Sequence, residues 1–307
     1  MKKLINYIAI ITIAITIISC NGNDVKKSNQ KVVICTTETI SDAIRNILPS
    51  TFKVEALMGP GVDPHTYKSK SSDLKGLLSA DAIVYNGIHF EANLVDAIHN
   101  MSNKQFVIGL GNIVPKDRLR STTDFGTAYD PHFWHDINLF ATSIELASKL
   151  FAKQFPENAH YIDSATVTYL AQLTETEKFV VDQLKSIPDS SRVIITAHDA
   201  FGYYGRAFNI EVRGVQGINT ASDISIRGIT DLTDFIVARK IKAIFVENSV
   251  SEKNIQSVSE GCEAKGHKLL QGGTLFSDGL GDKKSGANTY IKMIKANTTT
   301  IVEALKP

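Results

Sequence analysis

The chain has 307 residues, of which 43% are hydrophobic and 21% charged, with 33 basic against 32 acidic side chains. This balance is typical of a folded globular protein and excludes disordered, collagen-like and coiled-coil chains. The lack of a basic excess argues against a nucleic-acid partner. A single long apolar run excludes several transmembrane helices, and three cysteines are too few for a disulfide scaffold.

The apolar run lies at the amino terminus. Two lysines precede Leu4–Ile18, which as a helix spans about 22 Å, less than a hydrocarbon core of about 30 Å. The pattern predicts a signal peptide over residues 1–19, with an uncleaved signal anchor as the alternative. The run ends in two isoleucines, a serine and Cys20, which resembles a bacterial lipobox. We therefore expect a lipid on Cys20, a polar tether over residues 20–30 and an extracytoplasmic, membrane-anchored lipoprotein.

Two cysteines remain after this segment, Cys35 and Cys262, far apart in the sequence. A disulfide between them is possible, but we favour two buried free thiols.

From residue 31 onward, short β-rich runs alternate with helical patterns. Strands are predicted over 31–37, 52–58, 82–86, 105–110, 192–197, 211–215, 243–247 and 268–271. Helices are predicted over 38–48, 71–80, 90–100, 136–155, 201–209, 224–240, 252–265 and 286–305. This alternation predicts an α/β fold of parallel-rich sheets flanked by helices.

One long helical pattern separates the two halves. Pro156 suits the first turn of a helix, Pro188 ends one, and apolar residues recur between them at three- or four-residue steps. A helix over residues 156–187 is about 47 Å long, more than one βα crossover needs. We expect an N-terminal lobe at 31–155 and a C-terminal lobe at 188–307, joined by this rigid linker helix.

The same tripeptide, Asp-Pro-His, occurs at Asp63–His65 and again at Asp130–His132. Proline restricts the backbone before each histidine, and the aspartate can bond local backbone or orient an imidazole. A rigid loop that presents a histidine is what a metal site requires. The alternative for each is a loop histidine with a local hydrogen bond.

A third histidine and a carboxylate follow strands in the second half. His198 comes directly after the strand 192–197, and Asp278 lies in the glycine-rich segment 272–281. Open α/β sheets bind ligands at the carboxyl ends of their strands. Two ligands from each half would place a metal in the cleft between the lobes. Otherwise His198 caps the following helix and Asp278 belongs to a turn.

The order of these motifs resembles a known family. The segments DPHTY, DPHFW, TAHDAFGYYGRAFNIEVRGVQGI and LFSDGLG, with a long helix between the second and third, are similar to those of the metal-binding lipoproteins of zinc and manganese ABC importers. These are the cluster A-I solute-binding proteins, and residues 214–231 are most similar to their TroA-like branch. The resemblance implies His65, His132, His198 and Asp278 as ligands of one Zn²⁺ or Mn²⁺. It also implies a monomer that serves a membrane permease and an ATPase, with no catalytic residues.

The sequence leaves the metal open. Dedicated zinc members often carry a His- and acid-rich loop between the first two ligands, and Gly111–Asp130 contains no histidine. Three imidazoles nonetheless suit zinc, which lies above manganese in the Irving–Williams order. A bidentate Asp278 would raise the coordination number and favour manganese.

Two further carboxylates are predicted to support the ligands from outside the coordination sphere. Glu247 ends the strand 243–247 and points toward the cleft by topology, and Asp63 precedes His65. His135 lies three residues after His132, a spacing at which two histidines can share a metal, but four ligands already complete the site. The other histidines are expected on the surface.

The preferred function is capture of a divalent metal for an ABC importer. A zinc hydrolase with the same residues needs a coordinated water and a general base, for which Glu247 is the nearby candidate, and no H-E-x-x-H or G-x-S-x-G motif occurs. A siderophore or haem receptor needs a wide pocket lined by arginines or aromatic residues. We expect the metal to leave through movement of the loops that hold His198 and Asp278.

Overall fold

The computed structural model describes residues 30–91, 94–122, 129–222 and 224–307. The predicted signal peptide, Cys20 and most of the tether lie outside these residues. Within them, Lys31–Pro307 forms one compact unit. None of the helices in this part of the chain has the length and apolar character needed to cross a membrane.

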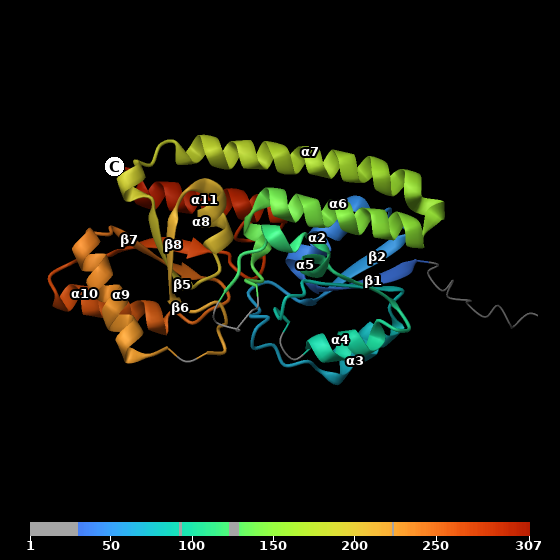
Figure 1. The fold of residues 1–307 in the computed structure, drawn as a ribbon, viewed down its shortest axis with the longest axis horizontal. Coiled ribbons are helices and arrows are strands. Elements are labelled where there is room, and N and C mark those ends of the chain that lie inside the picture. Colours follow the sequence, from blue (N-terminus) through green and yellow to red (C-terminus); the bar gives the residue numbers. More distant parts are fainter. Residues whose placement is uncertain (1–29, 92–93, 123–128, 223) are drawn as a thin grey trace, which may run out of the picture. The chain divides into compact units, whose positions relative to one another are not determined.

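The first half of the chain forms one four-stranded parallel sheet in the order β2-β1-β3-β4 (Figure 1). Its strands are β1 (Lys31–Thr37), β2 (Phe52–Met58), β3 (Ala82–Tyr85) and β4 (Phe106–Gly109). Residues of β3 are buried throughout, as expected for a central strand covered by helices on both faces. The parallel pairing brings the carboxyl ends of all four strands to one edge.

The second half forms two parallel pairs, β5 with β6 and β7 with β8. These strands are β5 (Val193–His198), β6 (Glu211–Gln216), β7 (Ala243–Glu247) and β8 (Leu270–Leu275). β5 also lies beside β7, and their carboxyl ends meet, since His198 at the end of β5 donates hydrogen bonds to Glu247 at the end of β7. The predicted α/β fold with parallel sheets is confirmed in both halves.

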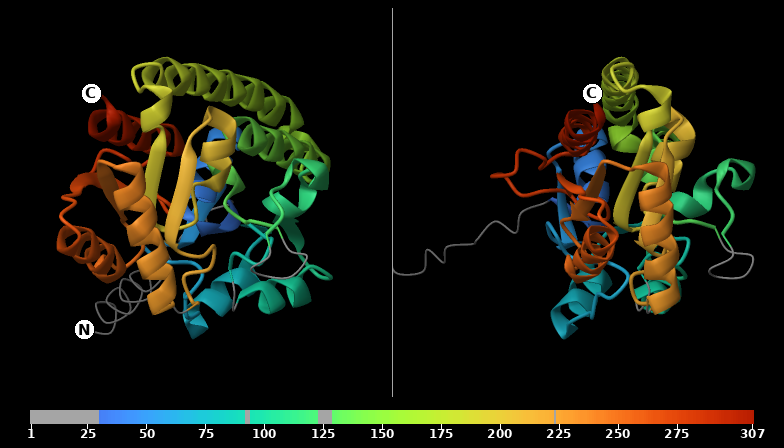
Figure 2. Two further views of the ribbon diagram at one scale, coloured as in Figure 1. Left: turned by 60° about the vertical axis from the view of Figure 1, so that its left-hand side comes forward. Right: turned by 90° about the vertical axis from the view of Figure 1, so that its left-hand side faces the viewer.

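Helices flank the strands on two sides (Figures 1 and 2). One side carries α2 (Glu38–Ile47), α6 (Ile137–Gln154), α7 (Ala159–Leu184) and α11 (Tyr290–Leu305). The other carries α3 (Ser71–Ser79), α4 (Val95–Met101), α9 (Ile226–Arg239) and α10 (Lys253–Ala264). The shorter α5 (Leu110–Ile113) and α8 (Gly202–Phe208) follow β4 and β5.

The long helix between the halves is shorter than predicted. Pro156 begins a 3₁₀ turn, and the α-helix proper is α7, whose 26 residues correspond to about 39 Å. It ends at Leu184 because Pro188 disfavours helical backbone at the residue before it. α7 packs against α2 and α6 from the first half and against α11 from the second.

Other predicted boundaries are also wrong, and the largest differences are at α4, β8 and α11, which begins at Tyr290 rather than at Gly286. The helix expected from Phe90 begins at Val95, because Phe90 and Glu91 belong to the turn after β3. The strand expected to end at Gln271 continues to Leu275 through two glycines. A Cβ at the first of them, Gly272, would lie 2.6 Å from the Phe245 ring, so glycine here allows close packing rather than a loop.

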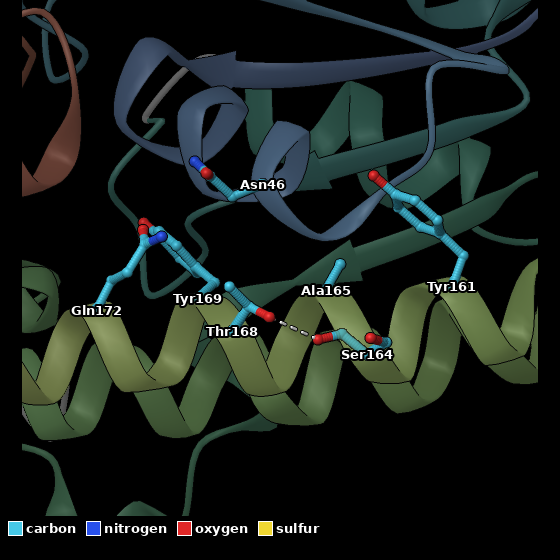
Figure 3. Close-up of a pocket in the computed structure, with 7 residues that line it drawn as sticks. All are labelled: Asn46, Tyr161, Ser164, Ala165, Thr168, Tyr169 and Gln172. Carbon is cyan, nitrogen blue, oxygen red and sulfur yellow. Dashed lines mark hydrogen bonds between the residues drawn. The ribbon is translucent and has the colours of Figure 1, made fainter.

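The largest buried cluster includes residues of both halves. It joins α2 and α6 of the first half to α11 and strand β7 of the second, with α7 between them, through side chains such as Phe140, Leu173 and Tyr290. Phe140 and Tyr290 stack with ring centroids 4.2 Å apart. Cys35 and Cys262 are buried free thiols, as predicted. A hollow of about 290 Å³ beside α7 is lined by Asn46 of α2 and by six residues of α7, including Tyr161, Ala165 and Tyr169 (Figure 3).

Replacing Leu173 tests how far α7 contributes to this shared core. Leu173 is 1% exposed, so Leu173→Ala should lower the free energy of unfolding by about 2–5 kcal/mol through lost burial and a residual cavity. Denaturant unfolding followed by circular dichroism measures the change. Val167 on the same helix is 69% exposed, and Val167→Ala should change stability by less than about 0.5 kcal/mol. Equal losses in both variants would contradict a core role for α7.

Candidate metal centre

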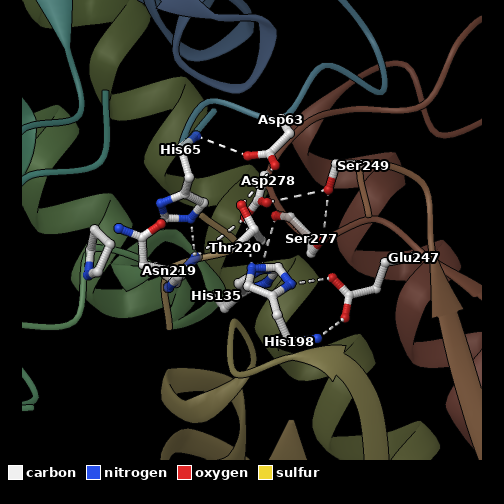
Figure 4. A network of polar contacts seen from close by, with 12 residues as sticks. Asp63, His65, His135, His198, Asn219, Thr220, Glu247, Ser249, Ser277 and Asp278 are labelled. Atoms are coloured by element: carbon white, nitrogen blue, oxygen red, sulfur yellow. Dashed lines mark hydrogen bonds and ion pairs between the residues drawn. The ribbon is translucent and has the colours of Figure 1, made fainter. Parts of the chain in front are cut away.

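The four predicted ligands come together from four separate segments. His65 lies in the loop after β2, and His132 immediately precedes the 3₁₀ turn Phe133–His135. His198 is the last residue of β5, and Asp278 lies three residues beyond β8. Each segment is at a carboxyl strand end or faces one, which is where open α/β sheets place ligands. Figure 4 shows His65, His198 and Asp278 directed toward one point.

One ligand atom of each residue lies within 4.8 Å of the other three. The Nε2 atoms of His65 and His132 are 3.2 Å apart, and Asp278 Oδ1 is 3.3 Å from Nε2 of both His132 and His198. Ligand atoms about 2.0–2.1 Å from a tetrahedral metal are roughly 3.3 Å from one another. All four side chains are buried, and His198 Nε2 and Asp278 Oδ1 have no hydrogen-bond partner. The arrangement leaves lone pairs facing one another, which a cation at their centre would satisfy.

Glu247 orients His198. At the end of β7, its carboxylate accepts the Nδ1–H of His198 at 2.6 Å and the His198 backbone N–H at 2.9 Å. Because Nδ1 carries the proton, the Nε2 lone pair faces the other ligands. The predicted supporting contact of Glu247 is therefore present in the structure (Figure 4).

Asp130 orients the imidazole of His132. Its Oδ1 accepts from the His132 ring Nδ1 at 2.8 Å and from the His132 backbone N–H at 3.0 Å, while its Oδ2 pairs with Arg120 at 2.5 Å. Arg120 also lies 3.9 Å from Asp199 of the second half. A Cβ at Gly202 would collide with the Arg120 guanidinium, so glycine leaves room for this arginine. The buried carboxylate of Asp130 is thus balanced by a cation.

Asp63 bonds backbone rather than an imidazole. Its Oδ1 accepts the His65 backbone N–H at 2.9 Å, and its Oδ2 accepts the Thr220 hydroxyl at 2.7 Å. Asp278 uses its second oxygen to accept the Ser249 hydroxyl at 3.2 Å. One carboxylate oxygen of Asp278 therefore remains for the centre.

The pKa values of the ligands diverge. Burial lowers the pKa of His65 to about 3. Burial also opposes a charge on His198, but the carboxylates of Glu247 and Asp278 outweigh it and hold the pKa of His198 well above its usual value. Burial alone would raise the pKa of Asp278, yet the positive charge of His198 holds it well below its usual value. A divalent cation would replace the positive charge that protons supply here.

Aromatic side chains surround the imidazoles. The Phe90 ring lies 5.0 Å from the His65 ring and 5.8 Å from the His132 ring, and Trp134 lies 5.3 Å from His132. Phe90 and Trp134 are both buried. Such surroundings exclude water and strengthen the electrostatic interactions at the centre.

His135 does not join the four ligands. Its Nε2 lies 3.1 Å from the Ser277 carbonyl, an acceptor, so this nitrogen carries the proton. Burial lowers the pKa of His135 to about 3, which keeps the ring neutral. Of the remaining histidines, His89, His99 and His160 are exposed, as expected.

Residues 33–304 match the family of the periplasmic component A of the zinc-uptake complex, ZnuA. The chain belongs to this family. It is 38% identical to the manganese-binding lipoprotein MntA of Bacillus subtilis over 297 residues, which is 96% of either chain. It is 35% identical to the zinc-binding protein TroA of Treponema pallidum over 284 residues, 92% of either chain. The solved TroA structure superposes with a TM-score of 0.87 and covers 91% of this chain and 100% of its own.

Family membership agrees with the resemblance drawn from the motifs, and it fits a transport protein rather than an enzyme. Nothing local in the sequence marks Arg120, Ser249 or Thr220 as contacts of the site. Asp130 carried a signal, since it opens the second Asp-Pro-His tripeptide, but only the structure shows that it bonds the imidazole and Asp63 does not.

Glu247→Gln should weaken binding of Zn²⁺ or Mn²⁺ by about 10–100-fold, because the amide no longer fixes the His198 tautomer and its charge is lost. Competition titration with a chromophoric chelator measures the affinity. Glu263→Gln on the exposed face of α10 is the matched control and should bind as the wild type does. Equal affinity of the two variants would show that Glu247 does not orient the ligand.

A buried glutamate next to Phe90 predicts a pH effect on stability. Glu91 accepts hydrogen bonds from Thr36, Asn86 and Gly87, yet burial outweighs them and raises its pKa from 4.5 to about 7. The folded state therefore binds the proton more tightly than the unfolded state, so this group's contribution to stability falls as pH rises from about 4.5 to 7.

Relative to Glu91→Gln, which cannot titrate, the metal-free wild type should lose of order 3 kcal/mol of stability across this range. Urea unfolding at several pH values measures the difference. A difference that is flat or rises with pH would contradict the prediction.

Proposed function

We propose that this protein binds one Zn²⁺ or Mn²⁺ outside the cytoplasm and delivers it to an ABC importer. The observation that carries the proposal is the convergence of His65, His132, His198 and Asp278, whose four buried ligand atoms lie within 4.8 Å of one another. Three imidazoles and one carboxylate are ligands that both metals accept. The names of the relatives agree, since MntA is manganese-binding and TroA zinc-binding.

The geometry favours zinc as the more tightly bound ion in vitro. Asp278 directs one oxygen to the centre while Ser249 holds the other, so four ligand atoms are supplied. Zinc is satisfied by four tetrahedral ligands and lies above manganese in the Irving–Williams order. Manganese uptake would then depend on the availability of the two ions rather than on raw affinity.

Two rival functions fit the site less well. A hydrolase needs a free general base, but both oxygens of Glu247 already accept hydrogen bonds from His198. A haem or siderophore receptor needs room between its ligands, whereas the nearest ligand atoms here are 3.2–3.3 Å apart. A small ion fits this spacing.

The location and partners belong to the same proposal. We take residues 1–19 as the signal peptide, Cys20 as the lipid attachment point and residues 20–30 as the tether. Residues 31–155 and 188–307 are the two lobes, joined by the linker helix. The relatives' names include metal-binding lipoproteins of ABC transporters, which supports a membrane anchor with a permease and an ATPase as partners of a monomer.

Elemental analysis after loading and desalting tests the proposal. We expect about one Zn or Mn per wild-type chain. His65→Ala should lower the metal affinity by more than about 100-fold, because removing a ligand weakens binding more than removing a residue that only bonds a ligand. His160→Ala, an exposed change on α7, should bind as the wild type does. No metal in the reconstituted wild type would refute the function.

A further inference from the structure

The carbonyl of Ser277, the residue before Asp278, accepts two hydrogen bonds from the first half of the chain. Trp134 donates its Nε1–H at 3.0 Å, and His135 donates its Nε2–H at 3.1 Å. A carbonyl oxygen has two lone pairs, so both bonds form together. Ser277 and His135 are fully buried and Trp134 is 3% exposed, so water does not compete for these bonds.

The two donors are themselves held in place. The His135 ring packs on Phe201 with centroids 4.5 Å apart and an angle of 34°. The Trp134 carbonyl accepts the Tyr290 hydroxyl at 2.7 Å. Both donors belong to the 3₁₀ turn that directly follows His132, so the turn that carries one ligand also holds the backbone beside another.

The second half holds the same segment from its other side. The Asn248 side chain accepts the Ser277 N–H at 3.4 Å and donates to the carbonyls of Gly279 and Leu280 at 3.3 and 3.4 Å. Ser249 bonds the Asp278 carboxylate. These bonds lie within the second half, whereas those from Trp134 and His135 join the segment to the first half. Figure 4 shows His135, Ser249, Ser277 and Asp278 close to one another.

The peptide plane transmits the position of the carbonyl to the ligand. The Ser277 carbonyl and the Asp278 nitrogen belong to one rigid peptide unit, so fixing the oxygen fixes where the Asp278 Cα begins. Asp278 Oδ1 then lies 3.3 Å from two histidine nitrogens. Withdrawal of Asp278 from the first half breaks both hydrogen bonds to Ser277.

We propose that Trp134 and His135 are positioning residues that hold Asp278 at the metal through the Ser277 carbonyl and thereby slow release of the metal. The proposal rests on the proposed function. It assigns His135 the role of a hydrogen-bond donor. The spacing of His135 from His132 in the sequence does not by itself distinguish this role from that of a metal ligand.

Stopped-flow release of Zn²⁺ into excess chromophoric chelator tests the proposal in the full mature chain. His135→Phe keeps a ring against Phe201 but lacks the donor, and Trp134→Phe keeps an aromatic ring but loses the indole N–H together with part of the ring. Each should raise the dissociation rate about 2–10-fold, the effect of one neutral hydrogen bond, and leave the association rate unchanged. The double variant should release faster than either single variant. His135→Gln, whose amide can donate from a similar reach, should restore slow release.

The outcomes separate the two proposals. Unchanged release in both single variants, or release from His135→Gln as fast as from His135→Phe, would overturn the positioning role while metal binding stands. A wild type that binds neither Zn²⁺ nor Mn²⁺ would overturn the proposed function and the positioning role with it. Thermal unfolding of the metal-free variants shows whether a variant has lost its fold. If His135→Phe has, the release rates of Trp134→Phe and His135→Gln decide whether the positioning role holds.

Discussion

Three imidazoles and a carboxylate meet in the interior of this protein, and their four ligand atoms lie within 4.8 Å of one another. Polar atoms such as His198 Nε2 and Asp278 Oδ1 are buried there with no hydrogen-bond partner, and burying such groups costs free energy. Side chains free to move would separate and regain solvent or other partners. The rest of the structure must therefore hold each of these four groups against that tendency.

Supporting contacts meet this need in two ways. Glu247 and Asp130 take the Nδ1–H of His198 and His132, so that the opposite nitrogen of each ring presents a lone pair. His65 is held instead by its backbone, through Asp63. Arg120 partly balances the negative charge of the carboxylates at the centre. It contacts Asp130 and also lies near Asp199, which belongs to the second half.

The halves of the chain share one core, which limits how the centre can open. Side chains of α2, α6, α7 and α11 form a continuous buried cluster, so a large separation of the halves would expose apolar surface. Movement confined to the segment around Asp278 breaks a few polar bonds and leaves this core intact. The hydrogen bonds between Ser277 and the turn after His132 lie where such a movement would begin.

The sequence by itself determined the features that depend on neighbouring residues. Strand and helix alternation, the proline-bounded long helix, the two Asp-Pro-His turns and the residues that follow strands are local, and they marked His65, His132, His198 and Asp278 as candidates that the family resemblance joined into one site. Local rules placed the start of α4 and the end of β8 wrongly, because Glu91 accepts a hydrogen bond from Thr36 of β1 and Gly272 packs closely against Phe245 of β7. The sequence placed Glu247 near the cleft, but only the tertiary structure decided that it bonds His198, 49 residues away, and that His135 bonds Ser277, 142 residues away. Pairings across such separations depend on how sheets and helices pack, which no local pattern encodes.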